Sequence, residues 1–176
     1  LSSQQQLSLI TSNLGEKIDN ISNYAITLSI NSNIADVLKE NPTVPENTLE
    51  HFLVNSELTD QAQRIIGLHK NIYAWDILDT ENHWFHSSTT ETDQLDSILG
   101  PEVLDSLQTN LAFQFLGPFQ ISGEPTFVAL KSITNIDNTK YLGALVLLIR
   151  ETNISSAFRD LPDSSSRDFY ITDENG

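Results

Sequence analysis

The chain has 176 residues, of which 39% are hydrophobic, so it can bury the core of one sizeable domain. Its 24 acidic and 9 basic residues give a formal net charge of −15. Such a surface repels nucleic-acid phosphates and anionic membranes, so we predict no nucleic-acid partner. With no cysteine, the chain has no disulfide, no thiolate metal site and no cysteine nucleophile.

The ends of the sequence suggest a segment of a longer protein. It contains no methionine, and its first residues show no signal-peptide pattern. Residues 169–176 read as the opening of a hairpin. No apolar run reaches the roughly 18 residues that a membrane-spanning helix needs. We therefore expect any membrane helices to flank this segment.

The first 30 residues predict one long helix, which would span about 45 Å. Apolar side chains recur every three or four positions and form one stripe: Leu7, Ile10, Leu14, Ile18, Ile21, Ala25 and Leu28. The stripe can pack on the sheet of its own domain, on a second copy of the chain, or on both, with the N-terminal end pairing and the later turns docking on the sheet. For a homodimer, the interface candidates are Leu7, Ile10, Leu14, Ile18 and Ile21.

Two more helices are expected before the sheet. Ser32 is the expected N-cap of a short helix that ends at Glu40. After a Pro-containing loop, a second helix begins near Asn47 or Thr48. Its apolar side runs as far as His69.

After residue 70 the pattern becomes that of strands. Residues 72–78 and 83–87 predict a β-hairpin around the acidic turn at 79–82. Residues 93–110 predict one or two short helices, and strands follow within 113–121, 126–133 and 140–150. Five strands with helices before and between them predict an α+β domain with an antiparallel sheet. A short exit helix, 152–161, and a linker then precede residues 169–176.

This order of elements resembles the double Cache sensor domain of bacterial receptors. Residues 117–149 are similar to the family's last strands, with Lys131 ending the penultimate strand and Gly143 preceding the last apolar run. Residues 169–176 resemble the strand and turn that open the membrane-proximal module. This stretch of sequence is most like the corresponding stretch in sensor histidine kinases that are paired with AraC-type response regulators.

The resemblance implies a PAS-like five-stranded antiparallel sheet against which the long N-terminal helix packs. Residues 1–45 would hold the long and short helices, 46–161 the membrane-distal Cache module, and 162–176 a linker and the start of a truncated membrane-proximal module. The domain would lie on the extracytoplasmic side of the cell membrane. It would touch the membrane only through flanking helices outside the segment.

The resemblance also implies a function, which is sensing a small-molecule ligand for a transmembrane receptor, in the first place a two-component histidine kinase. A chemotaxis receptor or a diguanylate cyclase is the alternative output, and a non-sensing cell-surface module is the alternative of another class. Amino-acid-binding members of the family carry an Arg followed closely by Trp and Tyr. The nearest aromatic stretch here, residues 83–86, has no arginine, so the ligand class stays open.

An aromatic-rich hairpin supplies most of the candidate ligand-binding residues, because Trp and Tyr combine a stacking face with a polar group. Alternation along the strand places Tyr73 and Trp75 on one face and Asp76 on the other, so only one set can line a pocket. The alternative is ordinary core packing. The complete set of candidates is Tyr73, Trp75, Asp76, Trp84, His86, Phe115 and Lys131.

Lys131 lies in an otherwise apolar strand. Either it needs a buried partner, such as a ligand carboxylate, or its stem reaches solvent. We expect the ligand between the sheet and residues 93–110. The long helix would then tilt or slide as the ligand shifts the population of two arrangements.

No catalytic or metal-binding pattern is found. The chain has no Gly-rich phosphate loop, no Gly-x-Ser-x-Gly and no His-Glu-x-x-His, so we predict no catalytic residues and no enzymatic activity for this segment. His83 and His86 are three residues apart in a strand and point to opposite faces. We therefore predict no metal and no cofactor.

Overall fold

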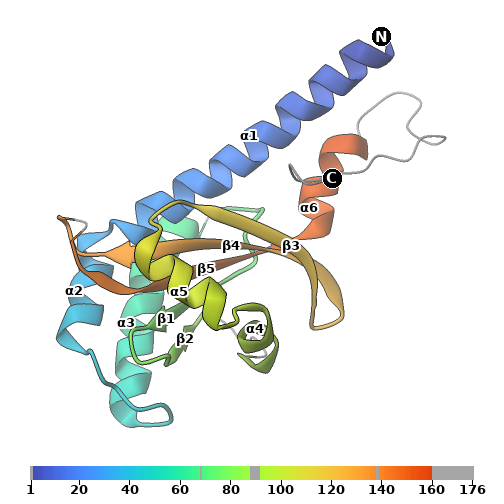
Figure 1. Cartoon of the computed structure of the whole chain (residues 1–176). Helices are drawn as coiled ribbons and strands as arrows, with labels where there is room; N and C mark the ends of the chain where they lie inside the picture. Colours follow the sequence, from blue (N-terminus) through green and yellow to red (C-terminus); the bar gives the residue numbers. More distant parts are fainter. Residues whose placement is uncertain (1, 68, 88–91, 138, 160–176) are drawn as a thin grey trace.

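The computed structural model describes residues 2–67, 69–87, 92–137 and 139–159 (Figure 1). The elements in chain order are α1 (Ser3–Ser29), α2 (Ser32–Glu40), α3 (Leu49–Ile66), β1 (Ala74–Asp79), β2 (Trp84–His86), α4 (Thr92–Ile98), α5 (Pro101–Thr109), β3 (Gln114–Ile121), β4 (Glu124–Thr134), β5 (Tyr141–Arg150) and α6 (Glu151–Arg159). This order and the predicted α+β class are confirmed. The predicted linker and start of a second module, residues 162–176, lie outside the described residues.

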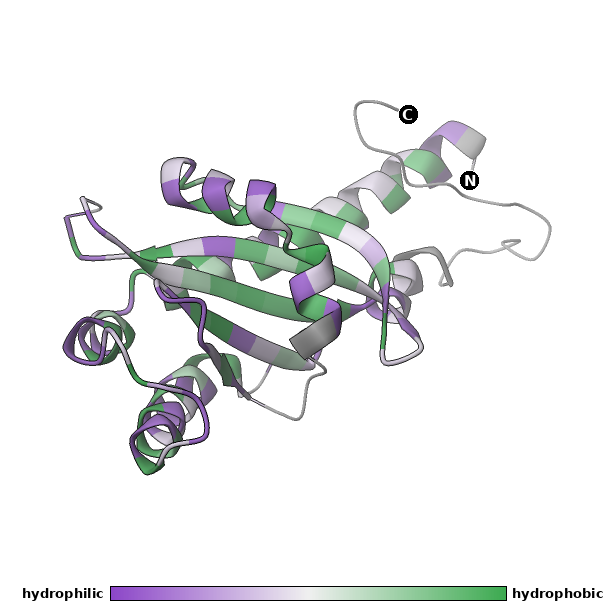
Figure 2. Cartoon of the chain, turned by 60° about the horizontal axis from the view of Figure 1, so that its bottom comes forward, coloured by the Kyte–Doolittle hydropathy of each residue, from purple (hydrophilic) through white to green (hydrophobic). Residues whose placement is uncertain are grey.

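The strands form one five-stranded antiparallel sheet in the order β2-β1-β5-β4-β3. Helices α1, α2 and α3 cover one face, which we call the helix face, and α4 and α5 cover the other, the insert face (Figure 1). Strand β5, in the middle of the sheet, is buried on both sides and is therefore a nearly continuous apolar run (Figure 2). In β3, a register shift between Leu116 and Phe119 accounts for the irregularity expected near Gly117.

Side chains of β1 alternate between the two faces as predicted. Trp75 and Ile77 belong to the core of the helix face, whereas Ala74 and Leu78 belong to the core of the insert face. Successive residues of one strand therefore contribute to two separate cores.

The long helix α1 begins with a capping box, in which the Ser2 hydroxyl accepts from the Gln5 amide and the Gln5 side chain accepts from the Ser2 amide. Its later turns pack on β4 and β5, where Ala25 and Leu28 are fully buried. Its first turns extend beyond the sheet (Figure 1).

The predicted dimer-interface residues have different environments. Leu7 is 58% exposed, whereas Ile10 and Ile21 are already buried within their own chain. Leu14 and Ile18 are partly buried. Ile10 and Ile21 therefore offer a second copy less surface than Leu7 does. A homodimer through this stripe of α1 stays a prediction.

Both of the next two helices begin with a side-chain N-cap, and the cap of α2 differs from the predicted residue. Ser32 is not an N-cap, because Asn31 takes that place and its side-chain oxygen accepts from the Ile34 amide at 3.1 Å. Asn is at least as good an N-cap as Ser, so the residue types at positions 31 and 32 are both compatible with the N-cap of this helix. Helix α3 begins next to Thr48, as predicted, and the Thr48 hydroxyl caps it by accepting from the His51 amide at 3.1 Å.

The β1–β2 turn is built by Asp79, which is buried. Its Oδ1 accepts from the amides of Glu81 and His83, each at 2.8 Å. Asn82 takes a positive φ of 65°, a conformation that Asn tolerates well. The predicted turn chemistry is therefore confirmed.

Gly143 is expected to tolerate no side chain. It lies opposite Asp79 with φ +156°, and a Cβ there would stand 2.5 Å from the Leu78 carbonyl oxygen. Gly143→Ala should lower the free energy of unfolding by about 1–3 kcal/mol, the usual cost of overpacking. Urea denaturation measures this loss. Gly15→Ala is the control, since a Cβ at Gly15 meets nothing within 4 Å. Because Gly15 lies inside a helix, this change should raise the free energy of unfolding by about 0.5–1 kcal/mol. Equal effects of the two changes would contradict the packing at Gly143.

Tyr141 is expected to make stability fall at alkaline pH. Burial, and secondarily the charge of Asp79, raise the pKa of Tyr141 from 10.0 to about 12. Between pH 10 and 12 the folded state keeps this proton while the unfolded state loses it. The contribution of Tyr141 to the free energy of unfolding is therefore complete below pH 10 and is lost as the pH rises to 12. Tyr141→Phe should remove up to about 2–3 kcal/mol of this alkaline loss. Urea denaturation of both proteins across this pH range checks the difference, and parallel pH profiles would refute it.

Candidate ligand-binding site

A cavity of about 380 Å³ opens on the insert face, between the β1–β2 turn and helices α4 and α5. Its volume lies within the range of about 300–1,000 Å³ that is typical for small-ligand pockets. The lining residues come from the end of β1, the turn and both helices: Leu78, Thr80, Asn82, Asp96, Leu99, Pro101, Leu104, Asp105 and Gln108. This is the place where the sequence predicted a ligand, between the sheet and residues 93–110.

Helices α4 and α5 are held on the sheet by apolar contacts and by hydrogen bonds at both ends. Leu95, Leu99 and Leu107 are buried in the core of the insert face. The Gln94 side chain accepts from the Ser122 amide at 2.7 Å, and the Ser132 hydroxyl donates to the carbonyl oxygen of Leu107. The outer wall of the cavity is therefore attached to β3 and β4.

The cavity has an acidic rim and an apolar interior wall. Asp96 and Asp105 are both exposed carboxylates, and no Lys or Arg is among the described residues that line the cavity. Leu78 and Leu99 are buried and form an apolar wall. A ligand with a positive charge and a short apolar part matches these two properties.

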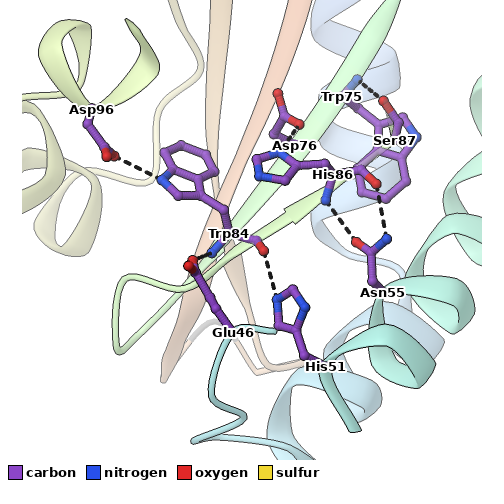
Figure 3. Close-up of polar contacts among 9 residues, drawn as sticks. All are labelled: Glu46, His51, Asn55, Trp75, Asp76, Trp84, His86, Ser87 and Asp96. Atoms are coloured by element: carbon purple, nitrogen blue, oxygen red, sulfur yellow. Dashed lines mark hydrogen bonds and ion pairs between the residues drawn. The ribbon is translucent and has the colours of Figure 1, made fainter. Parts of the chain in front are cut away.

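Trp84 connects this cavity to three other parts of the chain (Figure 3). Its indole Nε1 donates to Asp96 Oδ1 at 2.9 Å, which holds one of the lining carboxylates in place. Its backbone amide donates to the Glu46 carboxylate at 3.2 Å, and its carbonyl oxygen accepts from His51 Nε2 at 2.9 Å. The side chain itself is only 4% exposed, so Trp84 positions Asp96 and does not line the cavity.

The buried Asp76 pairs with the partly exposed His86 next to Trp84. They are register partners in β1 and β2, and His86 Nδ1 lies 2.7 Å from Asp76 Oδ1. The His86 ring stacks on Trp84 with centroids 5.9 Å apart. Asn55 of α3 accepts from the His86 amide at 2.8 Å and donates to its carbonyl oxygen at 3.2 Å, so its side chain continues the hydrogen bonding of this edge strand (Figure 3).

The other four predicted residues do not join this group. Trp75 and Phe115 pack in the core of the helix face, with Phe115 stacked on Phe127 at 5.0 Å. Tyr73 is 40% exposed and lies under the Arg150 guanidinium, 5.1 Å from the ring centroid. Lys131 lies two residues from Ala129 and from Ile133 in β4, so strand alternation places it on the helix face. Its Nζ donates to the Leu111 carbonyl oxygen, and burial lowers its pKa.

The seven candidates are thus divided between two faces of the sheet, and none of them lines this cavity. Asp76, Trp84 and His86 lie together on the insert face, and Trp84 bonds to the lining residue Asp96. Ligand binding by any of the seven stays a prediction.

Sequence reasoning missed the polar residues that do line the cavity. A signal was present in α5, where Pro101, Leu104, Asp105 and Gln108 share one helix face at spacings of three and four. It was weak because 24 carboxylates occur in the chain and nothing in the sequence shows which face of so short a helix meets the sheet.

None of the helices in the described ranges is both long and apolar enough to cross a lipid bilayer. Across the same ranges, no group of three or more His, Cys, Asp or Glu side chains is placed to hold a metal ion.

No protein-family model matches the sequence, and no curated protein sequence matches it. Among solved structures, the chain is similar to the periplasmic domain of LuxQ from Vibrio cholerae, with a TM-score of 0.60 and 13% identity over 89% of this chain and 70% of that one. It is also similar to the extracellular domain of the putative histidine kinase vpHK1S-Z8, with a TM-score of 0.59 and 18% identity over 88% of this chain and 59% of that one.

A third similar structure is the ligand-binding domain of the Campylobacter jejuni chemoreceptor Tlp3 in complex with 4-methylisoleucine, with a TM-score of 0.58 and 12% identity over 90% of this chain and 62% of that one. The chain therefore spans 59–70% of the length of these three structures. At these identities the likeness establishes the fold. The chain has the PAS-like, Cache-like fold found in the extracytoplasmic domains of membrane receptors.

Proposed function

We propose that this chain is the extracytoplasmic ligand-sensing domain of a transmembrane signalling receptor. The observation that carries the proposal is the cavity of about 380 Å³ between the β1–β2 turn and α4–α5, in a fold shared with periplasmic and extracellular receptor domains. The segment itself has no catalytic role in this proposal. It binds the signal, and an intracellular domain of the same receptor produces the output.

The ligand that fits this cavity best is a small organic cation, such as an amine. Asp96 and Asp105 supply negative charge at the rim, and the net charge of −15 attracts cations to the whole surface. Asp96 already accepts one hydrogen bond from Trp84 at 2.9 Å, which orients its carboxylate. Charge-assisted hydrogen bonds from an ammonium group to these carboxylates are stronger than neutral ones.

The signal would leave the domain through α1 and α6. Strand β5 continues without a loop from Arg150 into α6 at Glu151. Helix α6 in turn contacts α1, where Lys17 Nζ donates to the Asn153 carbonyl oxygen at 3.0 Å and to Ser156 Oγ at 3.2 Å. A ligand that favours one position of α4–α5 on the sheet would shift the population of two arrangements and so tilt or slide α1.

The output we propose is histidine autophosphorylation, with an AraC-type response regulator as the partner inside the cell. The similar histidine kinase domain supports a kinase, and the similar chemoreceptor supports chemotaxis as the second output. Autophosphorylation of the full-length receptor in membrane vesicles, measured with and without ligand, separates these two outputs.

A thermal-shift series tests the cavity and its charge together. Small monoamines and diamines should raise the melting temperature of the chain, because a ligand that binds only the folded state stabilises it by about 2.7 kcal/mol at 100 times Kd. The alcohols and carboxylates of the same carbon skeletons should not. Asp105→Asn should weaken amine binding about 10- to 100-fold, the usual effect of removing one charged hydrogen-bond partner.

The matched control is Asp60→Asn. Asp60 is exposed on α3, away from the cavity, so this variant removes the same charge and should bind amines like the unaltered chain. If Asp60→Asn and Asp105→Asn weaken binding equally, general surface charge and not the cavity attracts the amines. If no amine, alcohol or carboxylate raises the melting temperature, the non-sensing structural module becomes the better interpretation.

A further inference from the structure

The first turns of α3 carry three apolar side chains that face solvent. Leu49 is 75% exposed, Phe52 66% and Leu53 58%. Phe52 and Leu53 follow Leu49 by three and four residues, so the three side chains lie together on one side of the helix. We call this group the α3 patch. The buried side of α3 is formed by other residues, which are Val54, Leu58, Ala62 and Ile66.

The α3 patch is not needed to hold its own helix in place. Polar contacts attach α3 to the hairpin, where His51 Nε2 bonds to the Trp84 carbonyl oxygen at 2.9 Å and Asn55 bonds to both backbone groups of His86 (Figure 3). Single exposed apolar residues are common on protein surfaces, whereas a cluster of them marks an interaction site.

The α3 patch has an acidic rim. Leu53 has Glu50 three residues before it and Glu57 four residues after it, and both glutamates are exposed. Residues three and four apart are neighbours on a helix surface, so both carboxylates lie next to the patch. Residues 46–63 contain four acidic residues and no Lys or Arg. The adjacent helix α2 carries two acidic residues and one basic residue, so it does not reverse the charge.

The acidic rim argues against a second copy of the chain as the occupant. In a symmetric dimer the patch would meet itself, and Glu50 and Glu57 would face the same carboxylates of the other copy. Like charges brought together at an interface oppose binding. The start of α1 differs in this respect, because the first 15 residues include the exposed Leu7 and Leu9 but no charged side chain.

The size of a stable interface decides the chemistry of the partner. A standard interface uses about 20–30 residues on each side, many more than the three of the patch. A protein seated on the patch therefore also covers the surrounding carboxylates and removes water from them. A carboxylate that loses water without gaining a cation is costly. The partner must consequently carry Lys or Arg around its own apolar centre.

We propose that the α3 patch is a docking surface for a protein partner that presents apolar side chains ringed by Lys and Arg, as one face of a basic amphipathic helix does. Apolar contact with Leu49, Phe52 and Leu53 forms the centre of this interface, and the carboxylates of the rim bind the basic residues. The patch shares no residue with the cavity under α4–α5, so docking there is separate from binding a small ligand.

Synthetic helical peptides serve as probes, and the fluorescence anisotropy of the labelled peptide measures binding to the chain. The first peptide has Leu along one helix face and Lys elsewhere. The second keeps the leucines but has Glu in place of Lys, and the third keeps the lysines but has Ala in place of Leu. Only the Leu/Lys peptide should bind, and added salt should weaken its binding, because salt screens exposed charges.

Variants of the chain then locate the binding surface. Leu53→Gln should weaken binding of the Leu/Lys peptide about 10-fold, because it removes an apolar contact but keeps a good helix former. Leu7→Gln is the matched control, since Leu7 is equally exposed at 58% but has no acidic rim, and it should bind like the unaltered chain. Phe52→Gln is a second variant with the same expectation as Leu53→Gln.

The charge of the rim is tested in the same way. Glu57→Gln should weaken binding of the Leu/Lys peptide about 3- to 10-fold, whereas Glu124→Gln, at an exposed position where β4 begins, should not. Asp105→Asn should leave peptide binding unchanged, so failure of the docking surface is distinguishable from failure of the amine-binding cavity.

Three results would overturn the proposal. The first is equal binding of the Leu/Lys and Leu/Glu peptides. The second is an equal loss of binding in Leu53→Gln and Leu7→Gln. The third is a dimer of the chain that Leu53→Gln abolishes, because the patch would then belong to an interface between two copies.

Discussion

The organisation of this protein depends on one constraint, which is that the five-stranded sheet is covered by helices on both faces. Strand side chains alternate between the faces, so neighbours in sequence enter separate environments. Trp75 and Asp76 illustrate this, since Trp75 packs in the core of the helix face and Asp76 pairs with His86 on the insert face. A single hairpin therefore contributes to the helix-face core and to the polar contacts next to Trp84.

The β1–β2 hairpin is an edge of the sheet, and its position is secured from both sides. On the α3 side, Asn55 bonds to both backbone groups of His86, and His51 donates to the Trp84 carbonyl oxygen. On the other side, the Trp84 indole bonds to Asp96 of α4. An exposed edge strand is open to pairing with other chains, and these contacts protect it. In the proposed sensing function, these contacts would connect the helix that carries Asp96 to the helix face, and through it to α1.

Much of the fold could be predicted from local patterns. The turn at Asp79, the start of α3 next to Thr48 and the alternation of β1 each depend on a few neighbouring residues, and each is confirmed. The candidate site could be predicted in location but not in its residues. Large aromatic side chains suggested a binding wall, yet Trp75 and Phe115 are buried in the helix-face core and Trp84 serves to orient Asp96. Aromatic residues stabilise cores as readily as they bind ligands, and sequence alone does not separate the two uses.

The sequence by itself determined the order of elements, the α+β class and the acidic surface, because hydrophobic period, turn residues and charge are local or additive properties. Only the tertiary structure decided which side of α5 meets the sheet, which carboxylates among the 24 line a cavity, and that Leu49, Phe52 and Leu53 of α3 face solvent. These features depend on contacts between residues far apart in the chain, such as Trp84 with Asp96 and Lys17 with Asn153. No pattern within one element specifies such contacts, because they result from how the two layers of helices pack against opposite faces of the same sheet.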